Sequence, residues 1–356
     1  MSQLSEQFLS LFKLDLPIIQ APMAGVQDHR LAVAVSSAGG LGSLPAAMLS
    51  LDALKSELTQ LCAKTDKPYN INFFCHTQPV FSEVREATWR AALKPYYNEF
   101  FGELGLDINN IPTGPGRAPF SYEAADVLEA FKPAVVSFHF GLPAADLLAR
   151  VKSWKRWGCK IISSATTVEE ALWLESQGVD AVIAQGLEAG GHRGHFLSPD
   201  LTQQMGTFVL LPQIVRAVKI PVIAAGGIAD ASGVQAALAL GASAVQIGTA
   251  YLLCDEATTS RIHRAALKSV SAQHTALTNL FTGRPARGIV NRLMRELGAV
   301  SDKSPDFPLA TGAVAPLRVA AEKAGSGDFS PLWSGQNASG CREISAEALT
   351  RLLTSY

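Results

Sequence analysis

The feature that most constrains the fold is an alternation along the chain. From residue 17 onward, short β-branched or apolar runs alternate about eight times with longer segments of helical spacing. This pattern is typical of βα units on a parallel sheet, and eight units predict an α/β fold of the TIM (β/α)8 barrel type. The expected strands are residues 17–20, 40–44, 69–74, 134–138, 160–164, 181–185, 222–225 and 244–247, and the expected helices are 28–38, 51–63, 122–131, 144–157, 168–177, 207–218, 231–240 and 256–269.

Two regions do not fit the repeat. Residues 76–120 carry several aromatic side chains and then a Gly/Pro stretch at 112–119, and the tail after about residue 270 is rich in glycine and proline. Insertions at βα positions of a barrel lie over its catalytic face. We therefore expect a barrel formed by residues 15–75 and 121–270, with 76–120 and 271–356 forming a smaller substrate-covering or lid module. Peripheral decoration and an oligomer contact stay open as alternatives for each region.

Composition excludes several classes of protein. With 48% hydrophobic and 17% charged residues over 356 positions, the chain is not disordered, and its formal charge of −1 argues against nucleic acid as a partner. The five cysteines are widely spaced and include no C-x-x-C pair, which argues against a disulfide framework or structural zinc. The histidines show no repeated ligand spacing, so we expect no metal site.

The chain also shows no membrane or secretion signal. Its first fifteen residues lack a basic segment and a small-residue cleavage site, and we therefore expect a cytoplasmic protein. Residues 231–253 are uncharged, but Gly233, Gly241, Gln235 and Gln246 interrupt them. This segment favours a packed helix followed by a buried strand over a membrane span.

The most informative local motif follows the strand predicted at 181–185. Gln185 ends that strand, and Gly190, Gly191 and His192 follow it where barrels keep their active sites. Paired glycines permit close backbone approach to a flat or anionic ligand, and an imidazole can act as a base or a hydrogen-bond donor near neutral pH. A flexible surface loop is the alternative interpretation.

A second signal comes from glycines after the last two strands. Gly226 and Gly227 follow one strand, and Gly248 and Thr249 follow the next, one βα unit later. Loops at these positions commonly hold a phosphate on backbone N–H groups, although simple turns would have the same glycines. No G-x-G-x-x-G follows the first strand, which disfavours a dinucleotide site of the Rossmann type.

Other strand ends carry weaker signals. Ala21, Pro22 and Met23 follow the first strand and could present backbone to a ring system, or form only a turn. Asn72 is a buried amide that needs partners, from a ligand or from the backbone. His139 ends another strand and places a second imidazole on the same rim of the barrel as His192. It is either a functional group or a core histidine whose hydrogen bonds are satisfied. No G-x-S-x-G is present to support a serine hydrolase.

Taken together, residues 20–25, 72–74, 137–141, 185–194, 225–227 and 246–249 resemble the nitronate monooxygenases, and the resemblance spans about residues 15–340. Its strongest parts are Gly-Gly-His-Arg-Gly at 190–194 and Ser-Phe-His-Phe-Gly at 137–141, the latter similar to class I of the family. Trp-Ser-Gly-Gln at 333–336 resembles a family element close to the flavin. The resemblance implies an FMN-containing barrel with a smaller substrate domain.

The resemblance also implies roles for individual residues. The implied FMN contacts are Ala21, Pro22, Met23, Asn72, Gln185, Gly190, Gly227, Gln246, Gly248 and Thr249, and the paired glycines add Gly191 and Gly226. His192 would lie beside the flavin and the substrate, either as a base or as a residue that orients an anion, and His139 is the second catalytic candidate.

The family activity is oxidation of an alkyl nitronate, such as propionate 3-nitronate, by O₂ to a carbonyl compound and nitrite or nitrate. We therefore expect a nitronate or nitroalkane and O₂ as partners and FMN as cofactor, and a homodimer stays open. The alternatives are a flavin-dependent enoyl reductase, against which the imidazole at 139 argues, and a non-catalytic flavin-binding protein.

Overall fold

The computed structural model describes residues 3–104, 106–111 and 117–355. Its main sheet has eight parallel strands in the order β1-β9-β8-β6-β5-β4-β3-β2, and a bridge between Ile19 and Leu41 joins β1 to β2. The strands are β1 (Ile18–Gln20), β2 (Gly42–Pro45), β3 (Tyr69–Phe74), β4 (Val135–His139), β5 (Lys160–Ala165), β6 (Ala181–Gln185), β8 (Val222–Ala225) and β9 (Ala244–Ile247). The predicted barrel is confirmed, and no strand end differs from expectation by more than two residues.

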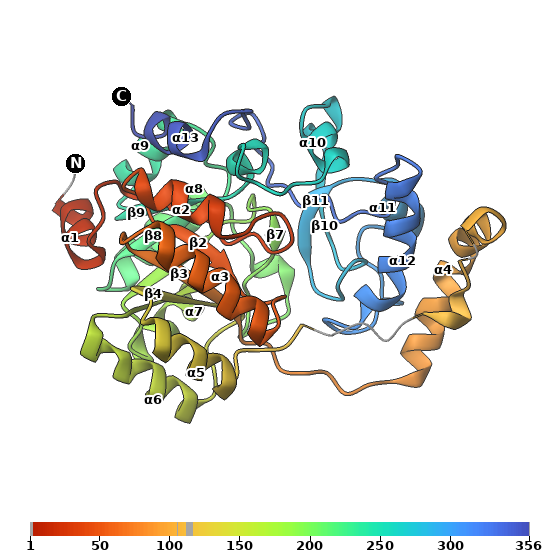
Figure 1. The fold of residues 1–356 in the computed structure, drawn as a ribbon, viewed down its shortest axis with the longest axis horizontal. Helices are drawn as coiled ribbons and strands as arrows, with labels where there is room; N and C mark the ends of the chain where they lie inside the picture. Colours follow the sequence, from red (N-terminus) through yellow and green to blue (C-terminus); the bar gives the residue numbers. More distant parts are fainter. Residues whose placement is uncertain (1–2, 105, 112–116, 356) are drawn as a thin grey trace.

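Helices surround this sheet, as Figure 1 shows. They are α2 (His29–Ser37), α3 (Leu51–Lys64), α5 (Tyr122–Phe131), α6 (Ala145–Ser153), α7 (Val168–Ser176), α8 (Thr207–Ala217) and α9 (Ala231–Ala239), with 3-10 segments η2 (Trp154–Trp157), η3 (Leu201–Gln203) and η4 (Thr249–Leu253). Ser50, Ser121 and Thr167 cap α3, α5 and α7 by accepting a hydrogen bond from a backbone amide of the first turn.

Two predicted helices have other bounds. The segment expected at 256–269 is α10 (Arg261–Leu267), followed by η5 (Val270–Gln273). It starts late because Ser260 is its N-cap, while the carboxylate of Glu256 accepts a hydrogen bond from the amide of Ala346. The helix expected at 144–157 is α-helical only to Ser153 and then tightens into η2.

An N-terminal helix closes one end of the barrel. In α1 (Gln3–Phe12), the side chains of Phe8 and Phe12 are buried against strand residues that include Ile162 and Ile223. These strand residues lie near the amino ends of their strands. The carboxyl ends are therefore the open end of the barrel.

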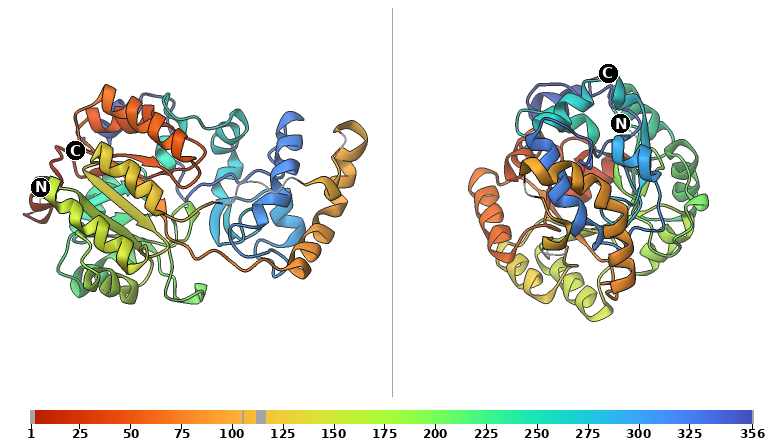
Figure 2. Two further views of the ribbon diagram at one scale, coloured as in Figure 1. Left: turned by 60° about the horizontal axis from the view of Figure 1, so that its bottom comes forward. Right: turned by 90° about the vertical axis from the view of Figure 1, so that its right-hand side faces the viewer.

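A smaller lobe covers that open end (Figures 1 and 2). It contains α4 (Glu83–Leu104), η1 (Ile108–Asn110), α11 (Arg292–Leu297) and α12 (Ala310–Lys323), and a three-stranded sheet of β10 (Thr275–Thr278), β11 (Ala286–Ile289) and β7 (Gly191–His192). The helices α4 and α12 share a core in which Trp89 Nε1 donates to the carbonyl of Ala310 and the Tyr97 hydroxyl donates to that of Ala313.

The proposed division of the chain stays a prediction. The helix α13 (Ala346–Leu352) packs on α2 of the barrel, and the hydroxyls of Thr350 and Tyr251 are 2.8 Å apart. Most of the Gly/Pro stretch at 112–119 lies outside the described residues.

The uncharged segment 231–253 contains α9 and then β9, as expected. In the described part of the chain, no helix is both long and apolar enough to cross a membrane. The cytoplasmic location stays a prediction.

Candidate active site

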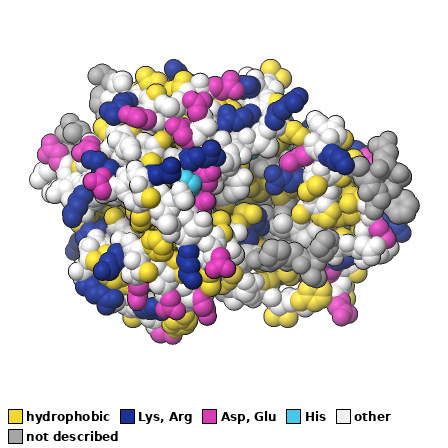
Figure 3. Space-filling view, in the orientation of Figure 1, with side chains coloured by type: hydrophobic (Ala, Val, Ile, Leu, Met, Phe, Trp, Pro, Cys, Tyr) yellow, Lys and Arg dark blue, Asp and Glu magenta, His cyan; other side chains and the backbone are white. Residues whose placement is uncertain are grey.

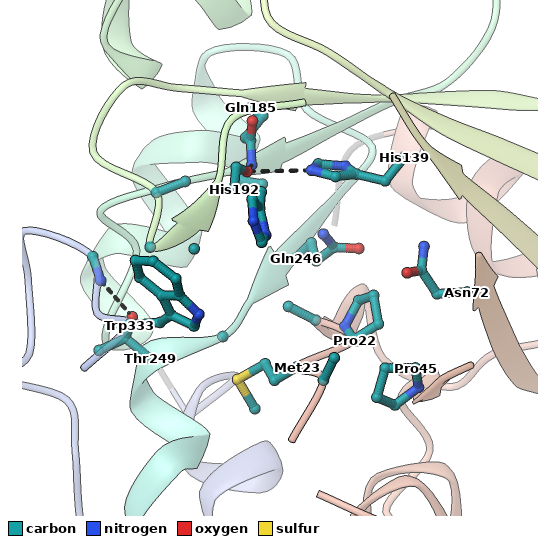
Figure 4. A pocket seen from close by; sticks show the side chains of 18 of the residues that line it. Pro22, Met23, Pro45, Asn72, His139, Gln185, His192, Gln246, Thr249 and Trp333 are labelled. Atoms are coloured by element: carbon teal, nitrogen blue, oxygen red, sulfur yellow. Dashed lines mark hydrogen bonds between the residues drawn. The ribbon is translucent and has the colours of Figure 1, made fainter. Parts of the chain in front are cut away.

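One pocket at the carboxyl ends of the strands brings every predicted site residue together, below the hollow between the two lobes (Figure 3). Its lining includes Ala21, Pro22, Met23, Asn72, His139, Gln185, Gly190, Gly191, His192, Gly226, Gly227, Gln246, Gly248 and Thr249. Figure 4 shows that their side chains surround a single space, with Trp333 on one side. The structure thus confirms that these residues are neighbours, and their individual roles stay proposals.

The glycine loops after β8 and β9 form one wall of this pocket. Gly226 and Gly227 have φ values of +117° and +73°, which L side chains rarely adopt, and a Cβ on Gly226 would lie 2.9 Å from Thr207 Oγ1. The backbone amides of Gly227 and Gly248 donate to no acceptor among the described residues. Gln246 Oε1, on the same wall, is buried and also lacks a partner among them. This wall therefore offers unsatisfied hydrogen-bonding groups to a ligand.

The loop after β1 is held by a residue that sequence reasoning missed. Gln27 Oε1 accepts hydrogen bonds from the amide of Met23 and from Gln20 Nε2, and Gln27 Nε2 donates to the carbonyl of Ser43. The loop is thereby tied to β2. Asn72, on β3, finds its partner in the protein, because its Nδ2 donates to Ser137 Oγ at 2.9 Å.

A hydrogen-bond network fixes the loop that carries His192. Gln185 Nε2 donates to the carbonyl of His192 at 2.9 Å, and Gln185 Oε1 accepts from the amide of Gly194 at 2.7 Å. His139 Nε2 lies 3.2 Å from the same His192 carbonyl, and His139 Nδ1 lies 3.0 Å from Ser164 Oγ. Since a carbonyl only accepts, His139 carries its proton on Nε2 and accepts from Ser164 at Nδ1.

Burial keeps both imidazoles uncharged near neutral pH. Desolvation lowers the pKa of His139 to about 3, although its bond to the His192 carbonyl opposes the shift. Desolvation also lowers the pKa of His192 well below its usual value, and the positive charge of Arg117 adds to the shift. A neutral imidazole can accept a proton, so His192 is in the protonation state that a base requires.

Pairing between the two lobes positions the His192 ring. His192 belongs to β7, which pairs with β11 of the smaller lobe, and its Nε2 lies 2.9 Å from Thr282 Oγ1. The rings of Phe307 and Trp333 lie 5.3 Å and 5.7 Å from the imidazole, centroid to centroid. Sequence reasoning missed Thr282 and Phe307, and no local pattern marks them.

Arg193 is a structural neighbour of the site. Its side chain is fully buried, and its guanidinium donates to Gln204 Oε1 and to the carbonyls of Gly186 and Gln185. These bonds hold the start of the loop that ends at His192. The motif at 190–194 therefore combines His192, which lines the pocket, with Arg193, which holds the loop in place through buried hydrogen bonds.

The 333–336 segment lies where the resemblance implies. The amide of Gly335 donates to Thr249 Oγ1 at 2.9 Å, and the amide of Gln336 donates to the carbonyl of Glu188. A Cβ on Gly190 would collide with the backbone of Ser334 and Gly335. Gly190 is thus required by close packing of two backbones.

The described residues contain no group of three or more His, Cys, Asp or Glu side chains that could hold a metal ion. A (β/α)8 barrel whose pocket at the carboxyl ends of the strands joins glycine loops to a partly buried, neutral imidazole defines an enzyme of the TIM-barrel class.

Comparisons with known proteins identify the family. A family model described as nitronate monooxygenase matches residues 5–355. The chain is 41% identical to a nitronate monooxygenase of Pseudomonas aeruginosa over 98% of both chains, and 41% identical to one of Paraburkholderia phytofirmans over 97% of this chain and 93% of the relative. The chain therefore belongs to the nitronate monooxygenase family and is an oxidoreductase.

Solved structures agree in fold. A nitroalkane oxidase from Streptomyces ansochromogenes has a TM-score of 0.84 and 39% identity, covering 97% of this chain and 96% of that one. FabK from Thermotoga maritima has a TM-score of 0.70 and 28% identity, covering 98% and 94%. The similarity extends over both lobes in each case.

Proposed function

We propose that this chain is an FMN-dependent nitronate monooxygenase that oxidises alkyl nitronates, such as propionate 3-nitronate, with O₂ to carbonyl compounds and nitrite or nitrate. The observation that carries the proposal is one pocket in which unsatisfied backbone amides and a neutral, partly buried imidazole face the same space. Family membership and the similarity to a nitroalkane oxidase support it.

The residues present fit FMN. Gly227 and Gly248 offer amide donors without acceptors at the ends of β8 and β9, where barrels hold phosphate groups. The buried Gln246 Oε1 needs a donor, and a flavin ring carries an N–H that can supply one. The small side chains of Ala21 and Ala24 leave room for a flat ring against the loop after β1.

In this proposal the phosphate end is held by Gly226, Gly227, Gly248 and Thr249, and the ring end by Ala21, Pro22, Met23, Asn72, Gln185, Gly190, Gly191 and Gln246. When bound, the isoalloxazine supplies the redox chemistry. The protein supplies orientation, and Trp333 with the smaller lobe limits the entry of water.

The proposed role of His192 depends on the substrate. In this proposal Thr282 Oγ1 donates to the carbonyl of Arg284, 3.3 Å away, and accepts the proton that His192 Nε2 carries. Nδ1 then has a free lone pair and no partner among the described residues. That atom can accept the α-carbon proton of a neutral nitroalkane, whereas a preformed nitronate has no proton to lose and needs only to be oriented.

His139 acts as a positioning residue in this scheme. Both of its ring nitrogens are engaged, with Ser164 and with the His192 carbonyl, so it has no free atom for proton transfer. It holds the backbone from which His192 extends.

The test is to purify the protein, record its visible spectrum and add propionate 3-nitronate with and without air. We expect a bound flavin identified as FMN after heat release, bleaching without air, and nitrite production with air. A colourless protein that takes up no added FMN would refute the proposal. Oxidation of a reduced nicotinamide with an enoyl thioester, without nitrite release from nitronate, would favour the enoyl reductase, to which the FabK fold is similar.

A further inference from the structure

Arg117 is a positively charged residue in the wall of the pocket, and the proposed reaction does not use it. Its side chain lines the same pocket as His192, and its Nη1 donates to Thr311 Oγ1 on α12 at 3.0 Å. Its guanidinium carbon lies 5.7 Å from the centre of the Phe307 ring. Desolvation lowers the pKa of Arg117 to about 10, so the group keeps its charge at neutral pH.

This charge has no anionic partner in the protein. Among the described residues, no Asp or Glu forms an ion pair with Arg117. The five residues before it in the sequence, 112–116, include no acidic residue either. A partly buried cation without a counter-ion is unfavourable, and a site that keeps one gains by binding an anion.

The phosphate of a cofactor is not that anion. Arg117 Nη2 lies 4.0 Å from Met48 Sδ, just after β2, and its Nη1 contacts α12. In the barrel order, β2 and β3 lie across from β8, whose loop carries Gly226 and Gly227. The guanidinium is thus on the opposite side of the barrel from the loop that carries Gly226 and Gly227.

Arg117 is instead close to the reacting centre. The Phe307 ring contacts both groups, because the His192 imidazole lies 5.3 Å from the ring centre that Arg117 approaches. A substrate whose reacting carbon lies at His192 would therefore bring a group a few bonds away toward Arg117. Arg284 is also buried near the site, but it stacks 4.1 Å from the Phe140 ring and does not line the pocket.

We propose that Arg117 recognises a carboxylate carried by the substrate a few bonds from its nitronate group, and so determines specificity for doubly anionic nitronates. This inference rests on the proposed function. A planar guanidinium with Nη2 free of strong partners can bind a carboxylate through parallel N–H···O bonds.

The experiment compares two nitronates that differ at one end. Propionate 3-nitronate carries the carboxylate, and propyl-1-nitronate has a methyl group in its place. We expect Arg117→Gln to lower kcat/KM for propionate 3-nitronate roughly 10- to 100-fold, mainly through KM, as expected for a hydrogen bond to a charged group. For propyl-1-nitronate the change should be less than about threefold, because that substrate has no carboxylate for Arg117 to bind.

A matched control removes the same charge elsewhere in the smaller lobe. Arg292 pairs with Glu99 and Glu296 on the lobe surface, and Arg292→Gln should leave both substrates unchanged. Calorimetry on the flavin-loaded wild type adds a readout without turnover: butyrate should bind at least about tenfold more tightly than butyramide, and this difference should vanish in Arg117→Gln.

Equal losses on both nitronates in Arg117→Gln would overturn the inference, because a structural role acts on both. Equal binding of butyrate and butyramide by the wild type would also overturn it, even if the variant fails to fold. If the wild type oxidises neither nitronate yet binds butyrate selectively, the proposed function fails while the anion site stands.

Discussion

Buried histidines make the stability of this protein sensitive to mild acid. His139, His195 and His263 have pKa values lowered to about 3, 3 and 4, in each case first by desolvation. In the unfolded chain a histidine has its ordinary pKa of about 6.5. Between that value and about 4, the unfolded state binds protons that the folded state does not, so the free energy of unfolding falls as the pH falls.

The magnitude follows from the linkage. Each such histidine contributes up to about 1.4 kcal/mol per pH unit, and integration from pH 7 to pH 5 gives about 2 kcal/mol for each and about 6 kcal/mol for the three. That loss is comparable to the whole stability of a typical domain, about 5–15 kcal/mol. Acidic residues with lowered pKa values, such as Glu322, lose their contribution only below about pH 4.5, so they stay nearly constant in this window.

The assay is urea unfolding followed by tryptophan fluorescence at pH 7, 6 and 5, on the wild type and His263→Gln. His263 Nε2 donates to the carbonyl of Trp333 at 3.0 Å, and the glutamine amide can replace this donor. We expect the variant to lose about 2 kcal/mol less than the wild type between pH 7 and 5. Both proteins are measured without flavin, because His263 lines the pocket and a bound cofactor would add its own stabilisation. Identical losses, or a wild-type stability that does not change over this range, would show that these histidines do not stay neutral in the folded protein at pH 5.

Three further predictions concern the pocket. Gly227→Val and Gly248→Val should abolish flavin retention, because Gly227 has a φ of +73° and a Cβ at Gly248 would lie 3.3 Å from Ala21 Cβ. A full flavin spectrum in both purified variants would contradict the assignment of these glycines to the phosphate site. His192→Asn should keep FMN and most activity on preformed nitronate but lose roughly 10- to 100-fold or more on neutral nitroalkane, with His139→Asn affecting both substrates alike as the control. Unchanged turnover of the nitroalkane at matched flavin content would show that His192 is not the base. Arg193→Met should lower the free energy of unfolding by about 3–5 kcal/mol, because Gln204 Oε1 and the carbonyls of Gly186 and Gln185 lose their buried donor; urea unfolding measures this, and a loss below about 1 kcal/mol would count against this role of Arg193.

Local patterns in the sequence were enough to predict the barrel and the residues that line the pocket. The periodicity of apolar residues predicts the strands and helices. Capping residues such as Ser121 and Thr167 predict where helices begin, to within a few residues. In a parallel barrel all the carboxyl ends of the strands meet at one end. Motifs as far apart as Ala21 and Gly248 could therefore be assigned to one site from their position after a strand alone.

The residues that surround His192 could not be predicted from the sequence. Its partner Thr282 is 90 residues away in the sequence, and Phe307 and Arg117 arrive from two other segments of the smaller lobe. The pairing of β7 with β11 brings the two lobes together. The strand β7 has only two residues, which is too short for a periodic pattern to predict it. The sequence also could not predict that the charge of Arg117 has no acidic partner, because it shows neither how far an arginine is buried nor which side chains lie beside it. Local patterns report how the backbone folds, whereas the charge and contacts of a site depend on side chains that meet only after long loops have closed.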